Sequence, residues 1–484
     1  MRGRQLGPIT LDTRGNALFA LAGGASIGLV LGLAVGDGPL KVLFAFLGVV
    51  FLALGIVYPR LILYVLVVLV ACLSETEYGV RTTQGVFRLP SFILDPVRLN
   101  LYEILIYCLL VILVTRRALD TLPRGVPGWI TVPCLVSALV IVLQLARALL
   151  AGARYVDVVL PFNGKYVLAA VVALWCFTEL LGEARTRLHL LDLLFVCGAG
   201  RSVYALVRFV FAGGDSSNAY RLSGVKVALW ESADHLLFVF LIIVVVGAWA
   251  TGRVSGKRLA CWAGGSTLMA LTVALSYRRT SWFGLAAALI LVSVVLLRRH
   301  QRSIALVAVA LAVLAGIATA SYGRFNSGVG LLARLFPDVV SRVGPTRQDE
   351  WALAWQTIVR NPIAGNLTAR RAASRFAFWD TRIVHNLFLF AWMKFGLVGL
   401  LSLCFLGGTC VVYAIRGVRA RASEEHISLG ALGLVPFTLA LAMFEQPLIE
   451  LRTLLILALV GALAVRVACS PEQCDRETDG DGPG

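Results

Sequence analysis

Long apolar runs separated by short polar segments dominate this chain. The pattern predicts an all-α fold, a polytopic transmembrane helical bundle of about 14 spans with a range of about 12 to 14, because a membrane helix needs about 20 mostly apolar residues. The run at 61–73 is short for a span. A signal peptide is the alternative for the first run, but no clear small-residue cleavage site follows it, so we expect a retained helix. The runs lie near residues 17–35, 40–57, 61–73, 99–114, 127–150, 164–181, 190–211, 234–250, 259–276, 280–297, 303–320, 386–413, 427–444 and 451–467.

One long polar segment, residues 321–384, interrupts this pattern. Within it, the stretch 347–360 places Trp351, Trp355 and Ile358 at i, i+4 and i+7. That spacing puts the three side chains on one helical face and predicts an amphipathic helix lying against the membrane surface. An Asn-Pro pair follows and ends the helix.

The distribution of apolar and polar segments divides the chain into four parts. The tail is polar, glycine-rich and acidic, which is typical of disorder. We expect an N-terminal transmembrane bundle at 1–320, an extracytoplasmic loop at 321–385, C-terminal transmembrane helices at 386–467 and a disordered cytoplasmic tail at 468–484.

The composition excludes a soluble globular protein. Of 484 residues, 59% are hydrophobic and only 15% are charged, against about 25% in soluble domains, and the mean hydropathy is +0.84. The net charge of +17 comes without a long basic run interleaved with aromatic residues, so no nucleic-acid partner is expected. The ten cysteines are scattered singly with no CxxC pair, which argues against a disulfide framework and a zinc site. We expect no metal and no cofactor.

The basic residues of the short loops are distributed asymmetrically. With the N-terminus inside, the inner segments carry 20 Lys and Arg residues and the short outer loops carry 11, a count that includes Arg452 on the outer side. Basic residues in short loops favour the cytoplasmic side. The sequence therefore predicts a multi-pass protein of the cytoplasmic (inner) membrane with both termini in the cytoplasm.

His385 is the foremost candidate for chemistry. It stands where the long polar segment meets the next apolar run, so one side of the residue faces water and the other faces lipid. Imidazole titrates near neutrality, and such a position suits a proton acceptor. The alternative is an interfacial histidine that caps a helix together with Asn386.

Arginines at the same outer level form a second candidate group. Arg278 and Arg279 lie in a very tight turn between two apolar runs, and Arg221 lies just before another run. A charge there is costly unless it has a partner. The guanidinium fork matches phosphate oxygens, so a diphosphate is a fitting ligand. A snorkelling contact with lipid headgroups is the alternative for one of the pair.

Further cations lie in or near the expected spans. Arg201 and Arg208 are seven residues apart in one run, and Lys394 follows His385 in the next. Such residues mark a functional site or are neutralised by nearby acids. The expected neutralising acids are Glu103, Glu231, Asp234, Glu445 and Glu450.

The long polar segment also contains a cluster of three arginines, Arg370, Arg371 and Arg375. This cluster is either a binding site for an anion or a solvated helix face.

Three segments together resemble the O-antigen ligase and polysaccharide polymerase superfamily of bacterial envelope proteins. The resemblance covers about residues 219–399, and the first two hundred residues match only as hydrophobic spans. The segments are Arg221-Leu222-Ser223-Gly224, then Arg279-Thr280-Ser281-Trp282 at the tight turn, and the long loop with Arg347, Trp351, Asn361-Pro362 and His385-Asn386-Leu387-Phe388-Leu389. The usual Ser-Arg of the turn is here Arg278-Arg279, and the glycine-rich stretch after the Asn-Pro is reduced to Gly365-Asn366.

The resemblance implies a membrane glycosyltransferase that works without metal at the outer face. Its partners would be an undecaprenyl diphosphate-linked glycan donor, a glycan or lipid acceptor and membrane lipids. His385 would activate the acceptor hydroxyl, and Arg221 and Arg279 would bind the diphosphate. Further substrate-binding residues would be Arg278, Arg208, Arg382, Asn386 and Arg347.

Three alternatives stay open at this point. A polymerase of the same superfamily would join repeat units instead of ligating a finished glycan. A lipid-glycan flippase or another polytopic transporter would have a similar number of spans. A cell-wall glycan polymerase of the shape, elongation, division and sporulation type would use an outer-loop carboxylate as its base, from Asp338, Asp349, Glu350 or Asp380.

Overall fold

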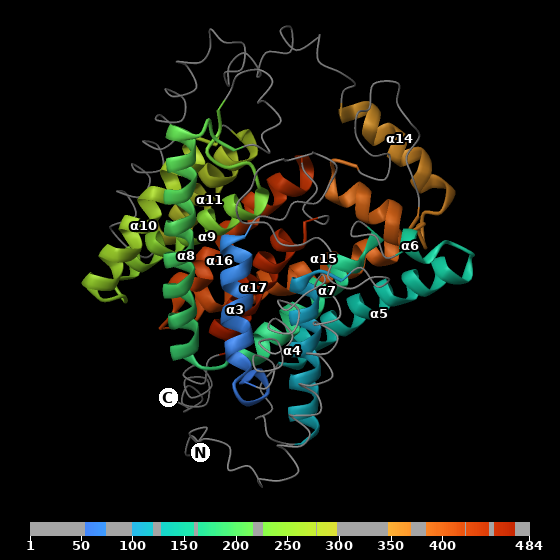
Figure 1. Cartoon of the computed structure of the whole chain (residues 1–484), viewed down its shortest axis with the longest axis horizontal. Coiled ribbons are helices and arrows are strands. Elements are labelled where there is room, and N and C mark those ends of the chain that lie inside the picture. Colours follow the sequence, from blue (N-terminus) through green and yellow to red (C-terminus); the bar gives the residue numbers. More distant parts are fainter. Residues whose placement is uncertain are drawn as a thin grey trace, which may run out of the picture. The chain divides into compact units, whose positions relative to one another are not determined.

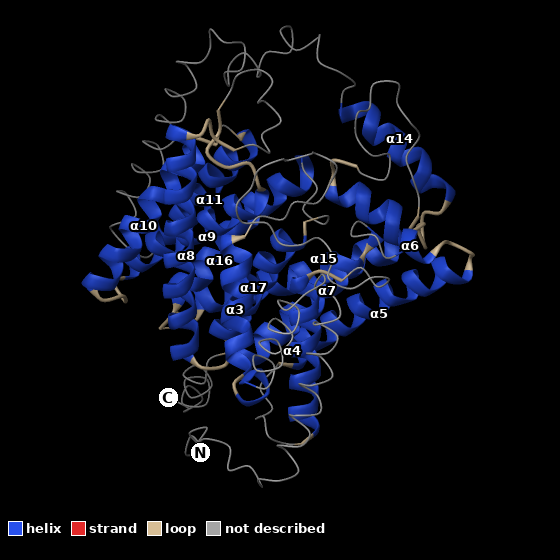
Figure 2. Ribbon diagram, in the orientation of Figure 1, coloured by secondary structure: helices blue, strands red, loops and turns tan. Residues whose placement is uncertain are grey.

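All secondary-structure elements described in the computed structural model are helices (Figures 1 and 2). The structure describes residues 54–73, 99–119, 127–158, 163–215, 226–276, 278–297, 347–368, 384–421, 423–444 and 450–469. The described helices are α3 (Pro59–Cys72), α4 (Leu101–Ala118), α5 (Gly128–Leu150), α6 (Tyr155–Val158), α7 (Lys165–Leu180), α8 (Ala184–Phe211), α9 (Ser232–Thr251), α10 (Gly256–Ala274), α11 (Arg279–Leu297), α14 (Arg347–Arg360), α15 (Leu387–Arg419), α16 (Glu425–Phe444) and α17 (Leu451–Ala468).

The predicted all-α membrane fold is confirmed. Each predicted apolar run within the described residues coincides with a helix, and seven of these helices are long and apolar enough to cross a membrane: α5, α8, α9, α11, α15, α16 and α17. Helix α8 begins at Ala184 and α15 continues to Arg419, beyond the apolar runs, because arginine and other polar residues also favour helix. The predicted runs at 17–35 and 303–320, and most of 40–57, lie outside the described residues.

The chain separates into two compact units. The first comprises residues 1–66 and 89–124, and the second comprises residues 67–88 and 125–484. In the first unit, α4 begins with a capping box in which Asn100 and Glu103 each accept a backbone N–H of the other, 2.9 Å in both cases. Glu103, one of the acids expected to neutralise Arg201, therefore caps its own helix.

Helix α9 lies at the centre of the second unit. It is apolar on every side and most of it is buried, as expected of a helix surrounded by others. It packs against α16, α10, α11 and α17, while α16 also packs against α11 and α15. Helices α5 and α17 cover other faces of α15, and α7 packs against α17.

Contacts between helix ends follow the predicted alternation of spans. At the end of the helices that was predicted to be cytoplasmic, Arg187 pairs with the Glu424 carboxylate, and Arg253 donates to the Arg421 carbonyl, 2.8 Å. We call this the Glu424 end. The end with His385 is the opposite one, and there Arg147 of α5 donates to the Ala364 carbonyl, 2.9 Å.

Four basic residues counted as loop charges are buried instead. Arg452 and Lys165 had been assigned to outer loops, and Arg187 and Arg466 to inner segments, but all four are buried. The assignment was wrong because each lies in the first or last turn of a helix and has a partner there. Arg187 donates to Glu424 and Arg466 to the Thr178 carbonyl, while the Lys165 ammonium lies over the Tyr166 ring. Removing two residues from each side leaves the inner excess unchanged.

Helix α14 forms with the predicted bounds, and one side of it is buried against the protein. Ala354 and Ile358 are buried, whereas Trp355 is 48% exposed. The Trp355 ring meets Trp392 of α15 edge-on, with 5.4 Å between ring centroids. The contact of this helix with the membrane surface stays a prediction.

Helix α15 is broken at Gly396, where φ is 70° and ψ is −176°. The segment 361–368 lies against the break and satisfies the backbone groups that the break leaves unpaired. The Leu397 N–H donates to the Pro362 carbonyl, 2.9 Å, and the Met393 carbonyl accepts from the Asn366 N–H, 3.0 Å. A break in a membrane helix requires such partners, since lipid offers none. The segment that follows α14 is therefore held to the helix that follows His385.

Two glycines make this contact possible. A Cβ on Gly396 would lie 2.1 Å from the Ile363 carbonyl oxygen, and a Cβ on Gly365 would lie 2.2 Å from the Gly396 nitrogen. Both have positive φ. We expect Gly396→Ala to lower the melting temperature and the yield of folded protein, because a positive φ combined with an extended ψ costs an L residue about 1–3 kcal/mol.

Gly407→Ala in the same helix is the matched control, since its added Cβ would meet nothing within 4 Å. Alanine there should stabilise the helix by about 0.5–1 kcal/mol. Thermal unfolding of the purified proteins in detergent measures both changes. Equal melting temperatures for the two variants would show that the Gly365–Gly396 contact does not hold the break.

Candidate functional site

His385 lies immediately before α15 and contacts a carboxylate of α14. The imidazole Nδ1 is 3.1 Å from each oxygen of the Glu350 carboxylate, and the His385 backbone N–H donates to Glu350 Oε1, 2.9 Å. The side chain of His385 is 23% exposed and that of Glu350 is 14% exposed. Glu350 thus holds the ring through Nδ1, while part of the His385 side chain remains exposed to solvent.

The chain around His385 is fixed by the start of α15. Asn386 is the N-cap, and its Oδ1 accepts from the Leu389 N–H, 3.0 Å, while Val384 is buried. The predicted helix start at His385-Asn386 is confirmed. Asn386 had been expected to bind substrate, and the structure gives its side-chain oxygen a capping bond.

Glu350 was missed as the partner of His385 by sequence reasoning, which considered it only as a base in an alternative mechanism. The two residues are 35 positions apart, and no local spacing connects them. The one available signal was the position of Glu350 in the first turn of the predicted amphipathic helix.

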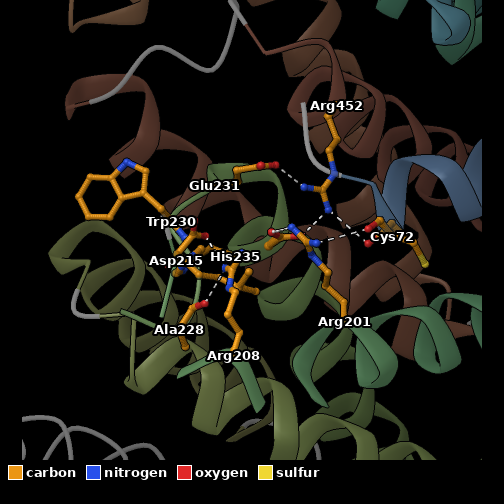
Figure 3. Close-up of polar contacts among 12 residues, drawn as sticks. Cys72, Arg201, Arg208, Asp215, Ala228, Trp230, Glu231, His235 and Arg452 are labelled. Atoms are coloured by element: carbon orange, nitrogen blue, oxygen red, sulfur yellow. Dashed lines mark hydrogen bonds and ion pairs between the residues drawn. The ribbon is translucent and has the colours of Figure 1, made fainter. Parts of the chain in front are cut away.

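Two of the predicted arginines, Arg208 and Arg278, both contact the segment 226–231, which precedes α9. Figure 3 shows Arg208 beside Ala228 of this segment. Arg208 pairs with Asp215, 2.8 Å, and donates to the Ala228 carbonyl, 3.1 Å. Arg278 donates to the Trp230 carbonyl and lies over the indole ring, 4.9 Å from its centroid. Both arginines therefore anchor this segment through their described contacts.

The other predicted arginines lie at or beyond the limits of the described structure. Arg279 is the first residue of α11 and Arg347 is the first residue of α14, and the side chains of both lie outside the description. Arg221 and Arg382 lie outside the described residues, as do Arg370, Arg371 and Arg375. Their roles stay predictions.

Arg201 belongs to a buried network of charges together with α9 and α17 (Figure 3). It pairs with Asp234, 3.0 Å from Nη2 to Oδ2, and Arg452 bonds both Asp234 and Glu231. The expectation that nearby acids neutralise Arg201 is confirmed for Asp234. Burial raises the pKa of the Glu231 carboxyl, opposed by Arg452 beside it, so Glu231 loses its charge at a higher pH than an exposed glutamate.

The same two arginines bind the C-terminal end of α3. Arg201 donates to the Cys72 carbonyl, 3.4 Å, and Arg452 donates to the Val70 and Ala71 carbonyls. The last carbonyls of a helix have no partner within it, and cations are favourable there. This network is a structural junction between α3, α8, α9 and α17.

Lys394 is buried in α15 and donates to the Asn163 side-chain oxygen and the Leu367 carbonyl, 3.0 Å each. Both acceptors belong to segments at the His385 end. Lys394 therefore fastens the segment after α14 to α15, next to the break at Gly396.

Among the described residues, no group of three or more His, Cys, Asp or Glu side chains is placed to hold a metal ion. The chemistry available at His385 is that of an imidazole beside a carboxylate. Such a pair can take a proton from a hydroxyl group.

Comparison with known families identifies the segment that carries this arrangement. Residues 264–404 match the family model described as O-Antigen ligase. The O-antigen ligase resemblance is confirmed over this segment. The O-antigen ligase segment contains the tight turn at Arg278 and Arg279, the whole of α14, and the His385–Glu350 contact. A search of curated proteins found no match to the chain.

Proposed function

We propose that this protein is a glycosyltransferase of the O-antigen ligase type, which moves a glycan from an undecaprenyl diphosphate carrier to a glycan or lipid acceptor. The observation that carries the proposal is His385, partly exposed at the start of α15 and held by Glu350 within the matched segment. An integral membrane protein of this superfamily acts on lipid-linked glycans, which suits the apolar helices around the site.

In the proposed reaction, His385 takes the proton of the acceptor hydroxyl as its oxygen attacks the anomeric carbon of the donor glycan. The bond from that carbon to the diphosphate breaks, and undecaprenyl diphosphate leaves. Arginines stabilise the charge of the leaving group because guanidinium donors match phosphate oxygens. Arg221 and Arg279 are our choice for this role, with Arg278, the neighbour of Arg279 in the chain, as the reserve.

We also propose that the His385 end faces outward from the cytoplasmic membrane and that both termini are cytoplasmic. The excess of basic residues on the opposite side supports this orientation. It places the reaction on the side where a finished lipid-linked glycan meets its acceptor.

A repeat-unit polymerase is the second candidate, since the O-antigen ligase match fits either reaction. Purified protein reconstituted with lipid-linked oligosaccharide and candidate acceptors tests both. One glycan block on the acceptor supports a ligase, and a ladder of lengths on the lipid supports a polymerase. Movement of the intact donor across the bilayer with no new glycosidic bond would reject both and support a flippase.

Arg221→Lys and Arg279→Lys should weaken donor binding by about 10–100-fold, because lysine keeps the charge and loses the paired hydrogen bonds. Binding of labelled lipid-linked oligosaccharide to each purified variant measures the change. Arg154→Lys is the matched control, since Arg154 is at the same end, is 82% exposed and pairs only locally with Asp157. Donor affinity that stays at the wild-type level in both Arg221→Ala and Arg279→Ala would remove these residues from the site.

A further inference from the structure

The His385–Glu350 contact defines which nitrogen of the imidazole can act. An ionised carboxylate only accepts hydrogen bonds. Nδ1 lies 3.1 Å from both Glu350 oxygens, so Nδ1 carries the proton that is donated to them. A neutral imidazole has one proton, and its lone pair is then on Nε2.

The same carboxylate also fixes the orientation of the ring. Glu350 Oε1 accepts the His385 backbone N–H, 2.9 Å, in addition to Nδ1. Two donors from one residue to one carboxylate restrict both the backbone and the ring. The Asn386 cap fixes the next residue, so Nε2 has a defined direction at the start of α15.

The position of Glu350 depends in turn on the broken helix. Helix α14, which carries Glu350, runs into the segment 361–368, and that segment is fastened to α15 at the Gly396 break. Buried Ile358 and Ala354 pack α14 in place. The Glu350 carboxylate is therefore carried by α14 and the His385 imidazole by the start of α15. The segment 361–368 connects these two helices and holds them together.

We propose that Glu350 is the positioning residue of the transfer reaction: it holds His385 in the Nδ1–H tautomer and directs Nε2 toward the acceptor hydroxyl. The proposal rests on the proposed function and deepens it. In the step itself the hydroxyl proton moves to Nε2, and the ring becomes imidazolium. The Glu350 carboxylate stabilises that charge through Nδ1–H and stays ionised, while the hydroxyl oxygen forms the new glycosidic bond and the diphosphate leaves.

This arrangement predicts which kinetic constant changes. Replacing the carboxylate that fixes the tautomer of a general-base histidine can cost as much as about 10⁴ in kcat, so Glu350→Gln and Glu350→Ala should lower kcat by about 10–10⁴-fold. The KM for the lipid-linked donor should stay near the wild-type value, because the donor is bound by arginines. Glu350→Asp keeps the charge and should recover more turnover than Glu350→Gln.

A second readout reports on the ring without any activity. Solid-state nitrogen NMR of membranes containing histidine-labelled protein distinguishes the two tautomers, and the difference from His385→Asn identifies the His385 signal. We expect the Nδ1–H tautomer in the wild type. Glu350→Ala should shift His385 to the Nε2–H form or to a mixture. The matched control is Glu183→Gln, an exposed glutamate before α8 at the Glu424 end, which should change neither readout.

The two readouts separate failure of this inference from failure of the proposed function. Wild-type kcat and an unchanged tautomer in Glu350→Ala would overturn the positioning role, even if the protein transfers glycans. Loss of turnover in Glu350→Gln together with full turnover in His385→Asn would make Glu350 itself the base and would also overturn it. If the wild type transfers no glycan, a tautomer change in Glu350→Ala still supports the Glu350–His385 coupling, and only the proposed function fails. Melting temperatures of the variants exclude simple unfolding.

Discussion

His385→Ala should lower the rate of glycan transfer by about 10²–10⁴, the usual contribution of a positioned general base. The reason is geometric: the ring is partly exposed at the start of α15 and its Nδ1 is occupied by Glu350. Donor binding should persist, since the arginines that bind the diphosphate are unchanged. The measurement is transfer of labelled glycan from the lipid carrier by equal amounts of folded, membrane-inserted protein.

His385→Asn is the sharper variant of the same test. Asparagine keeps polarity and hydrogen bonding at the mouth of the helix but cannot accept a proton at neutral pH. A histidine that only caps the helix should tolerate asparagine, and a base should not. His189→Asn is the control, because His189 is exposed in α8 at the Glu424 end. Near-normal transfer by His385→Asn would reject the base and favour the transporter alternative.

Asp234→Ala should destabilise the protein by about 3–5 kcal/mol, the cost of leaving buried charges without their partner. Asp234 is fully buried and bonds both Arg201 and Arg452. Its loss removes the carboxylate that Arg201 and Arg452 share, leaves Glu231 as the described carboxylate partner of Arg452, and loosens the hold of both arginines on the end of α3. Chemical or thermal unfolding in detergent, with the yield of inserted protein, measures the change.

Asp157→Asn is the control for this prediction. It breaks the surface pair with Arg154, which is 82% exposed, and should cost only about 0–1 kcal/mol.

A second test is the double variant Arg201→Met with Asp234→Ala, which should recover part of the lost stability because the cation that lost its carboxylate is also removed. If Asp234→Ala costs no more than Asp157→Asn, the buried network does not hold the helices together.

The helices were predictable from sequence because long apolar runs and membrane spans have the same length. Interruptions within those runs were not predictable. Gly396 stands in an apolar stretch that reads as one continuous helix, yet its backbone leaves the helical region because residues 361–368 supply the missing partners. The sequence around Arg452 predicts a tight outer loop. Its partners in the fold, Glu231 and Asp234, lie more than two hundred positions away in the chain, so local sequence gives no sign of them.

The candidate site was predictable in part. The position of His385 at a helix start followed from the change between polar and apolar sequence, and the Asn386 cap agrees with it. The contact with Glu350 depends on how α14 folds back on α15, which no local spacing encodes. Arg208 and Arg278 were recognised as charges near the outer level, but their described partners, Asp215 and the Trp230 carbonyl, come from the fold.

Glycan transfer by the purified protein in proteoliposomes is the direct test of the proposed glycosyltransferase function. The protein is supplied with lipid-linked oligosaccharide labelled in the glycan, together with a hydroxyl-bearing glycan or lipid acceptor, and the products are separated. The proposed mechanism predicts labelled glycan in a new glycosidic bond and release of one undecaprenyl diphosphate for each bond formed, with both signals reduced about 10²–10⁴-fold in His385→Ala. Release of the carrier with no new bond, or equal transfer by the wild type and His385→Ala, would contradict it.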